Sequence, residues 1–218
     1  MSLMRVGGKE DGGIDLVGWW WLPDIQDSSE SSRNFDSSPT TPRRRIRVIA
    51  QCKAEKKKLG PNYVRELEGV LFRFMSTVPG RTGGLSMGHD EDTEHSLIVN
   101  SKFPFPLVAL LISESAFTKS TLLRAYSSPI PFFLIHLPPI ESPMEFSEAK
   151  ENMNVLGSGI CNPALSGTRG LLKGNLEVRW ERSLVDGSGR PSLWWKEERL
   201  PSWAPDFPSH PELSKAPL

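Results

Sequence analysis

The stretch Ile46-Arg47-Val48-Ile49-Ala50-Gln51-Cys52-Lys53 decides how this chain folds, because it is an apolar run that ends in polar side chains. Its β-branched residues favour a strand that lies centrally in a sheet. Alternate side chains of a strand point to opposite faces, so Gln51 and Lys53 share one face, about 7 Å apart, while Cys52 points the other way. We therefore expect Cys52 to be a small core residue.

A carboxylate stands at the edge of another expected strand. Asp15 lies in the string Gly12-Gly13-Ile14-Asp15-Leu16, at the start of an apolar stretch. If that strand pairs beside the first one, a carboxylate, the amide oxygen of Gln51 and the ammonium of Lys53 converge. Hard divalent cations such as Mg²⁺ take oxygen ligands, and a nearby lysine can orient a water and offset charge on a phosphate. These residues outline a metal-dependent nuclease site.

The periodicity of the remaining chain predicts an α/β fold. A helix opened by Pro61 would place Val64, Leu67, Leu71 and Phe74 on one stripe toward the core. A second helix is expected between two apolar strands, which predicts that these strands pair in parallel. The expected strands cover residues 3–6, 14–22, 46–53, 107–112 and 130–137, and the second helix covers residues 116–126.

Charge gives a local signal rather than a global one. Acidic and basic residues balance at 26 each, but eight Lys or Arg stand against one Glu between Arg43 and Lys58, a net charge of 8 − 1 = +7. Charge runs are usually solvated loops, yet such clusters also hold phosphate backbones. Because this one adjoins Gln51 and Lys53, we expect it to contact nucleic acid through Arg43, Arg44, Arg45, Lys56, Lys57 and Lys58.

The cysteines and the hydropathy of the sequence limit the cellular compartments in which the protein is expected. Cys52 and Cys161 provide neither a disulfide framework nor metal-ligand spacing, which favours a reducing interior. No stretch approaches the roughly 20 apolar residues of a membrane span. The first residues resemble neither a secretory signal nor the Arg-rich amphipathic presequence of a mitochondrial protein.

The polar strings, taken in order, resemble a known superfamily. Asp11-Gly12-Gly13-Ile14-Asp15-Leu16, Gln51-Cys52-Lys53 and Tyr63-Val64-Arg65-Glu66-Leu67-Glu68-Gly69 together resemble the PD-(D/E)XK nucleases, in their Mrr-type restriction-endonuclease branch. Within that branch, the surroundings resemble the fungal mitochondrial "required for respiratory growth protein 7" family, closely over residues 5–140 and more weakly to residue 204. The strings that carry this closer resemblance are Gln51-Cys52-Lys53-Ala54-Glu55, Leu59-Gly60-Pro61, Arg65-Glu66-Leu67-Glu68-Gly69 and Ser113-Glu114-Ser115-Ala116-Phe117-Thr118.

The resemblance implies a fold, a location and an activity. The fold is a restriction endonuclease-like mixed sheet flanked by helices, and the location is mitochondrial. The activity is Mg²⁺- or Mn²⁺-dependent hydrolysis of DNA phosphodiester bonds, in support of genome maintenance and respiratory growth. Asp15 and Gln51 would hold the metal, with Gln51 where most of the superfamily has a carboxylate, and Lys53 would position water. Glu68 would brace Lys53 or the metal shell.

One departure from the family pattern leaves an alternative open. The family's first helix should precede Gly7-Gly8, and it is missing from this sequence, which begins at Met1. A reading frame that continues upstream of Met1 would explain the gap. So would a nuclease-fold protein that binds nucleic acid or a protein partner without cutting.

The expected domain organisation has one main unit and an extension. Residues 1–140 form the nuclease-like domain, with a disordered insertion at 24–45 and a long loop at 79–106. Residues 141–204 form a small β-rich extension, with a short helix at 145–155 and a hairpin that pairs 175–182 with 193–196. Residues 205–218 are a frayed tail. Trp180, Trp194, Trp195 and Trp203 are expected to cover this unit rather than to stack on bases.

Histidines offer two weaker candidates. His89, Asp90, Glu91, Asp92, Glu94 and His95 could hold a metal, but they lie in a Gly-rich segment where nothing fixes their geometry. A solvated acidic loop is therefore the expected role. His136 ends the 130–137 strand with no base or nucleophile beside it in the sequence, so we expect a structural role for it.

Overall fold

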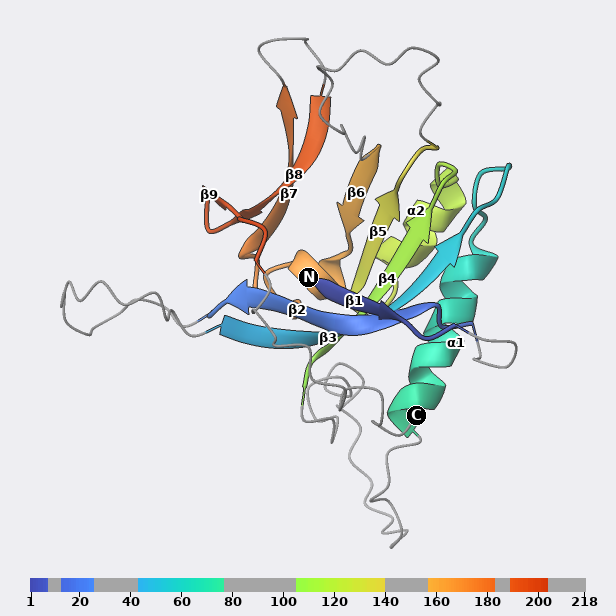
Figure 1. Ribbon diagram of the computed structural model, residues 1–218, viewed down its shortest axis with the longest axis horizontal. Helices are drawn as coiled ribbons and strands as arrows, with labels where there is room; N and C mark the ends of the chain where they lie inside the picture. Colours follow the sequence, from blue (N-terminus) through green and yellow to red (C-terminus); the bar gives the residue numbers. More distant parts are fainter. Residues whose placement is uncertain (8–12, 26–42, 77–104, 140–156, 183–188, 204–218) are drawn as a thin grey trace, which may run out of the picture.

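The computed structural model describes residues 1–7, 13–25, 43–76, 105–139, 157–182 and 189–203, which form two β-sheets and three helices (Figure 1). The larger sheet has six strands in the order β1-β2-β3-β4-β5-β6, and the smaller has three in the order β7-β8-β9. The strands of the larger sheet are β1 (Ser2–Arg5), β2 (Leu16–Pro23), β3 (Arg43–Lys53), β4 (Leu107–Ser113), β5 (Phe132–His136) and β6 (Ser158–Cys161).

The six-stranded sheet is mixed. β4 pairs in parallel with β5, as the helix between these two apolar runs predicted, and β3 also pairs in parallel with β4. The other three pairings, β1 with β2, β2 with β3 and β5 with β6, are antiparallel. The chain is therefore an α/β protein with a mixed sheet, which confirms that part of the expected fold.

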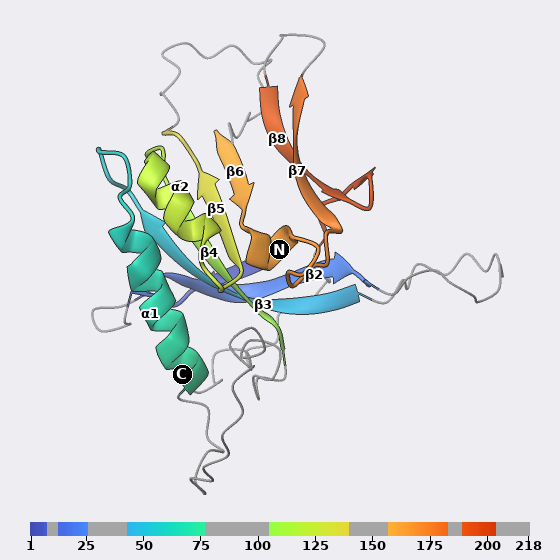
Figure 2. The ribbon, with the colours of Figure 1, turned by 180° about the vertical axis from the view of Figure 1, so that it is seen from behind.

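Helices α1 (Asn62–Ser76) and α2 (Lys119–Tyr126) cover one face of this sheet, side by side (Figure 2). The predicted stripe on α1 is confirmed, since Val64, Leu67 and Leu71 are fully buried and Phe74 packs against them. Burial of each such side chain contributes on the order of 2 kcal/mol. The other partners in this core include Val17, Ile49, Ala109, Leu111, Phe132 and Leu134.

The opposite face carries a second core under the short helix α3 and the smaller sheet. These elements are α3 (Pro163–Ser166), β7 (Leu176–Arg182), β8 (Gly189–Trp195) and β9 (Glu198–Arg199). Trp20 and Phe133 stack on this face with ring centroids 5.8 Å apart. Figure 1 shows the smaller sheet and the α1–α2 pair on opposite sides of the larger sheet.

Two of the element boundaries that differ from the expected ones have a clear structural cause. β3 begins at Arg43, inside the stretch expected to be disordered, because residues 43–45 pair with β2. α2 begins at Lys119 rather than at residue 116, because the Thr118 hydroxyl accepts the N–H of Thr121 and caps the helix there. Charge and helix propensity alone do not report such tertiary and capping contacts.

The antiparallel pairing of β7 with β8 confirms the predicted hairpin, but its second strand begins at Gly189 rather than at residue 193. The expected helix at 145–155 and most of the loop at 79–106 lie outside the described residues. Two elements were not predicted: β6, which extends the larger sheet, and α3, whose N-cap Asn162 is buried and bonded to five backbone groups. None of the helices in the described part of the chain is long and apolar enough to cross a membrane.

Candidate active site

The carboxyl end of β3 sends two polar side chains toward the first turns of α1. Gln51 is 1% exposed, and its Nε2 donates to Glu66 Oε1 at 2.9 Å. Lys53 Nζ lies 3.8 Å from the same oxygen. The two side chains thus share a face, as the period-two spacing predicted, and they also share a partner.

Asp15 joins this group from the neighbouring strand. The β2–β3 register pairs Leu16 with Ala50, and the Asp15 N–H also donates to Ala50 O, so Asp15 lies where this ladder ends. Its Oδ2 accepts the Cys52 N–H at 2.7 Å. The carboxylate therefore replaces a backbone carbonyl at the end of the ladder and is fixed beside the Gln51-Cys52-Lys53 segment.

Gly13 makes room for this arrangement. Its φ of +86° lies in the left-handed region, which favours glycine. A Cβ built on Gly13 would lie 3.0 Å from Gln51 Nε2 and 3.3 Å from Glu66 Oε1. The glycine that precedes Asp15 thus allows the backbone to approach the polar group closely.

The donor set suits a hard divalent cation. Gln51 Oε1 is buried and has no hydrogen-bond partner among the described residues. A buried acceptor without a partner costs roughly 1–3 kcal/mol, which a bound cation would offset. The same amide contacts the Glu66 carboxylate, and the Asp15 carboxylate is held on the N–H of the next residue, Cys52. Amide and carboxylate oxygens of the types that Mg²⁺ prefers thus surround this segment of β3. Within the described part of the chain, no three His, Cys, Asp or Glu residues cluster as a metal site, so the amide is essential to this set.

Tyr63 borders the same group on α1. Its ring centroid lies 5.1 Å from Lys53 Nζ, and its hydroxyl donates to Glu55 Oε1 at 2.9 Å. The hydrogen bond to Glu55 is the largest of the effects that raise the Tyr63 pKa. The Lys53 ammonium is thus held between a carboxylate and an aromatic face, with 22% of its side chain exposed.

The expectation that Cys52 is buried is wrong. Its side chain points to the face opposite Gln51, as predicted, but it is exposed. The apolar residues of that face, Ile46, Val48 and Ala50, lie under the second core, whereas Cys52 lies beyond it at the strand end. Partial burial, followed by the charge of Asp15, raises the pKa of this thiol.

Glu68 does not brace Lys53 or the site. Its side chain is 6% exposed and pairs with Arg124 of α2, on the core side of α1. Glu66, two residues earlier, occupies the expected place instead. Helical spacing aligns Glu68 with Val64 and Leu71, so the family pattern alone pointed to the wrong carboxylate. A sequence signal existed for Glu66: it lies one turn after Tyr63, off the apolar stripe and above the strand end.

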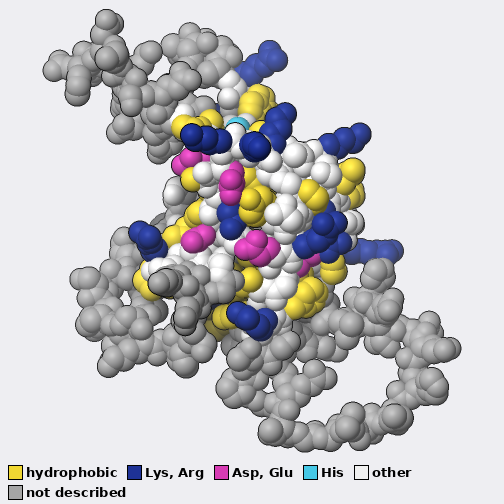
Figure 3. Space-filling view, turned by 90° about the vertical axis from the view of Figure 1, so that its right-hand side faces the viewer, with side chains coloured by type: hydrophobic (Ala, Val, Ile, Leu, Met, Phe, Trp, Pro, Cys, Tyr) yellow, Lys and Arg dark blue, Asp and Glu magenta, His cyan; other side chains and the backbone are white. Residues whose placement is uncertain are grey.

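The basic residues do not form one cluster. Arg43, Arg44 and Arg45 begin β3, while Lys56, Lys57 and Lys58 follow its end, so about 26 Å of strand, from Arg45 to Lys53, separates the two groups. The lysines are exposed beside the candidate site. Arg44 Nη1 donates to Leu171 O at 3.4 Å, on the side of the smaller sheet. Figure 3, which views the side of the molecule at the right of Figure 1, shows basic and acidic side chains interspersed there.

The weaker candidates stay outside the site. His136 Nε2 lies 3.2 Å from Glu114 O at the end of β5, which agrees with a structural role. The residues His89, Asp90, Glu91, Asp92, Glu94 and His95 lie outside the described residues.

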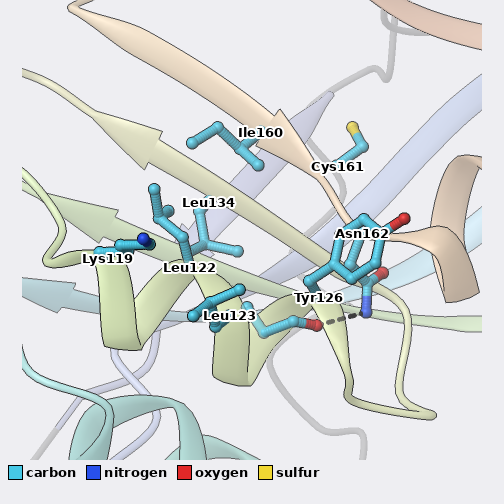
Figure 4. A pocket seen from close by; sticks show the side chains of 9 residues that line it. Lys119, Leu122, Leu123, Tyr126, Leu134, Ile160, Cys161 and Asn162 are labelled. Carbon is cyan, nitrogen blue, oxygen red and sulfur yellow. Dashed lines mark hydrogen bonds between the residues drawn. The ribbon is translucent and has the colours of Figure 1, made fainter.

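A cavity of about 180 Å³ lies between α2 and β6, away from the polar group (Figure 4). Its lining is mainly apolar, with Leu122, Leu134 and Ile160 among the lining residues. The amide of Asn162 donates to Ala125 O at 2.9 Å, so it is occupied within the fold. Burial raises the pKa of Cys161 to about 12, which leaves the thiol protonated at neutral pH. This cavity therefore lacks an available nucleophile, and Lys119 is the charged residue in its lining.

Comparison with known proteins gives a family match over most of the chain. The family model described as "Required for respiratory growth protein 7" matches residues 1–163. An uncharacterized mitochondrial protein of Schizosaccharomyces pombe is 38% identical over 79 residues, which cover 36% of this chain and 26% of that protein. The chain thus matches about a quarter of that relative's length. No solved structure matches.

Proposed function

Since the chain belongs to the required for respiratory growth protein 7 family, we propose that it carries a divalent-cation-dependent nuclease site of the PD-(D/E)XK type. The family and the mitochondrial relative place the protein in mitochondria with a role in respiratory growth. The proposed activity is hydrolysis of DNA phosphodiester bonds, and the proposed cofactor is Mg²⁺ or Mn²⁺. Such an activity would serve maintenance of the mitochondrial genome.

The observation that carries the proposal is the unpartnered carbonyl of Gln51, whose amide contacts Glu66 and whose neighbour Cys52 is bonded to Asp15. A buried amide oxygen without a donor is costly unless something occupies it. Asp15 and Gln51 would hold the cation, and Glu66 Oε1, now bonded to Gln51 Nε2, would join or orient them. When bound, the cation would polarise a phosphoryl oxygen and lower the pKa of a coordinated water.

Lys53 supplies the remaining chemistry from the chain itself. Its ammonium lies on the same face as Gln51 and is 22% exposed, so a phosphate approaching the strand end can reach it. There it would orient the attacking water and stabilise the negative charge that develops on the phosphoryl oxygens. Its present partner is Glu66, whose side chain is 46% exposed. Because this carboxylate is in contact with solvent, it offsets the positive charge of Lys53 only weakly.

Plasmid cleavage in the presence of Mg²⁺ or Mn²⁺ tests the proposal. We expect Asp15→Asn and Lys53→Ala to lower the cleavage rate by roughly 10²-fold or more, because each removes a charge from the reacting centre. Arg190→Ala is the matched control, since Arg190 is an exposed cation on β8, outside the polar group and outside the basic segment. Cleavage that persists in both Asp15→Asn and Lys53→Ala would place the activity elsewhere.

A second candidate function rests on the contacts and the charge of the polar group. Gln51 Nε2 and Lys53 Nζ both contact Glu66, and Gln51 brings one charge fewer than a carboxylate would. Both features favour a protein that binds nucleic acid without cutting it. In that case no cation would support cleavage, and DNA binding would be retained and would weaken with salt.

A further inference from the structure

The amino end of β3 carries a surface that the candidate site does not use. Arg43, Arg45 and Arg47 alternate along the strand, so they share the face of Gln51 and Lys53. On β2, Trp21 and Trp19 stand directly opposite Arg45 and Arg47. Phe105 and Trp203 complete the group. We name these seven residues the Arg–Trp ladder.

The ladder is organised by stacking. The Arg45 guanidinium lies 4.8 Å from the Trp19 ring centroid and 4.3 Å from that of Phe105. Arg47 lies 5.0 Å from Trp19, and Arg43 lies 4.5 Å from Trp203. The rings also contact each other edge to face, Trp19 with Phe105 and Trp21 with Trp203. Aromatic and guanidinium planes thus alternate over one face of the sheet.

The charges of the ladder are not neutralised within the described residues. None of the ion pairs found there involves Arg43, Arg45 or Arg47. Arg43 Nη1 is buried without a hydrogen-bond partner among those residues. Stacking uses the flat face of a guanidinium and leaves its N–H donors in the plane, where they can meet an anion.

From this arrangement we propose that the Arg–Trp ladder binds an unpaired segment of DNA. Aromatic rings stack on bases only where the bases are unpaired, and arginines can stack and contact phosphates at once. A duplex offers phosphates alone and leaves the rings unused. The choice of DNA rests on the proposed function, whose substrate class then becomes DNA with a single-stranded part.

The ladder is a separate surface from the candidate site. From Arg47 to Lys53 the strand runs about 20 Å, and Ile49, fully buried under α1, lies between them. A bound strand would therefore dock at one end of β3 while the reaction took place at the other. Binding at the ladder can be measured without any cleavage.

The test is binding of a labelled oligonucleotide of about 15 nucleotides by the full chain in EDTA, followed by fluorescence anisotropy. We expect Arg45→Gln to weaken binding roughly fivefold or more and to reduce the slope of log K against log salt by about 0.7, the value for one phosphate contact on a single strand. Arg45→Lys should keep that slope and still lose affinity, because it keeps the charge without the stacking plane. Trp19→Leu should lose affinity without a change in slope.

Arg179→Gln is the matched control. Arg179 also stacks on a tryptophan, at 4.6 Å from Trp194, but it belongs to the smaller sheet and is paired with Glu177. It should bind like the wild type. Any of four results would overturn the inference. Two concern the variants: Arg45→Gln binds as tightly as the wild type, or Arg179→Gln loses as much affinity as Arg45→Gln. Two concern the ligand: a duplex of the same length binds as tightly as the single strand, or the matching RNA binds more tightly. Binding without cleavage would remove only the proposed nuclease activity.

Discussion

The two ends of β3 carry polar side chains on the same face and use them differently. At the carboxyl end, Gln51 and Lys53 converge on Glu66, and a buried carbonyl is left without a donor. At the amino end, Arg43 and Arg45 stack on aromatic rings. The first arrangement concentrates oxygen atoms, as cation chemistry requires, and the second spreads flat surfaces, as base stacking requires. The difference teaches that a basic segment of sequence can hold two unrelated surfaces.

The largest expected effect is on the free energy of unfolding, which should depend on the Glu68–Arg124 pair much more than on Lys53 at the carboxyl end of β3. Arg124→Ala should lower the free energy of unfolding by about 3 kcal/mol, because Glu68 would remain buried without its cation. Lys53→Ala removes a cation in the same way but leaves Glu66, which is 46% exposed, so its cost should be below about 1 kcal/mol. Urea unfolding of both variants measures the difference. A loss of about 3 kcal/mol in Lys53→Ala would make the carboxyl end structural.

The expected effect of intermediate size is on DNA affinity, with duplex DNA bound near the carboxyl end of β3 and single-stranded DNA bound at its amino end. Changing Lys56, Lys57 and Lys58 together to Gln should weaken duplex DNA binding and lower its salt slope by up to about 2.7, since each duplex phosphate contact contributes about 0.9. These lysines are exposed beside the candidate site, so the fold should be unchanged. Single-strand binding should fall much less than it does in Arg45→Gln. Anisotropy titrations at several salt concentrations measure both, and equal losses on both ligands would merge the two surfaces into one.

The smallest expected effect reports on the contact between Asp15 and the β3 end. Partial burial and the Asp15 charge hold the pKa of Cys52 above its usual value. Asp15→Asn removes the negative charge, so the pKa should fall and the thiolate fraction at pH 8 should rise. Alkylation of Cys52, followed by mass spectrometry, should accelerate by a few-fold, because the thiolate is the nucleophile. Cys161, whose pKa burial raises to about 12, is the internal reference; an unchanged Cys52 rate would mean that Asp15 does not lie beside it.

The sequence predicted the elements whose periodicity is strong. The parallel pairing of β4 with β5, the apolar stripe of α1 and the shared face of Gln51 and Lys53 depend on local spacing, and each is confirmed. Glu66 and the exposure of Cys52 depend on where α1 and the second core end above the sheet. Those limits come from tertiary packing, which the spacing of residues along one strand does not encode.

The start of β3 is a second case in which local sequence did not predict tertiary contacts. Arg43, Arg44 and Arg45 have the composition of a solvated loop, yet they pair with β2 as a regular strand. Their partners Trp19 and Trp203 come from distant parts of the sequence, so no local pattern announces the stacking. The ladder forms through tertiary contacts between β2, β3 and the residues after β9.

The most direct test of the cation site is the melting temperature of Gln51→Glu with and without Mg²⁺. The substitution replaces the Gln51 Nε2 donor with a second carboxylate oxygen against Glu66 Oε1, which now lies 2.9 Å from that nitrogen. Without Mg²⁺ we predict a lower melting temperature than in the wild type, because two carboxylates repel at that distance. With Mg²⁺ the loss should be recovered, since a bound cation stabilises the folded state and the added charge tightens its binding. Gln51→Leu is the control, and it should not respond to Mg²⁺. A melting temperature of Gln51→Glu that stays low in Mg²⁺, or that rises no more than that of Gln51→Leu, would contradict a cation site at the carboxyl end of β3.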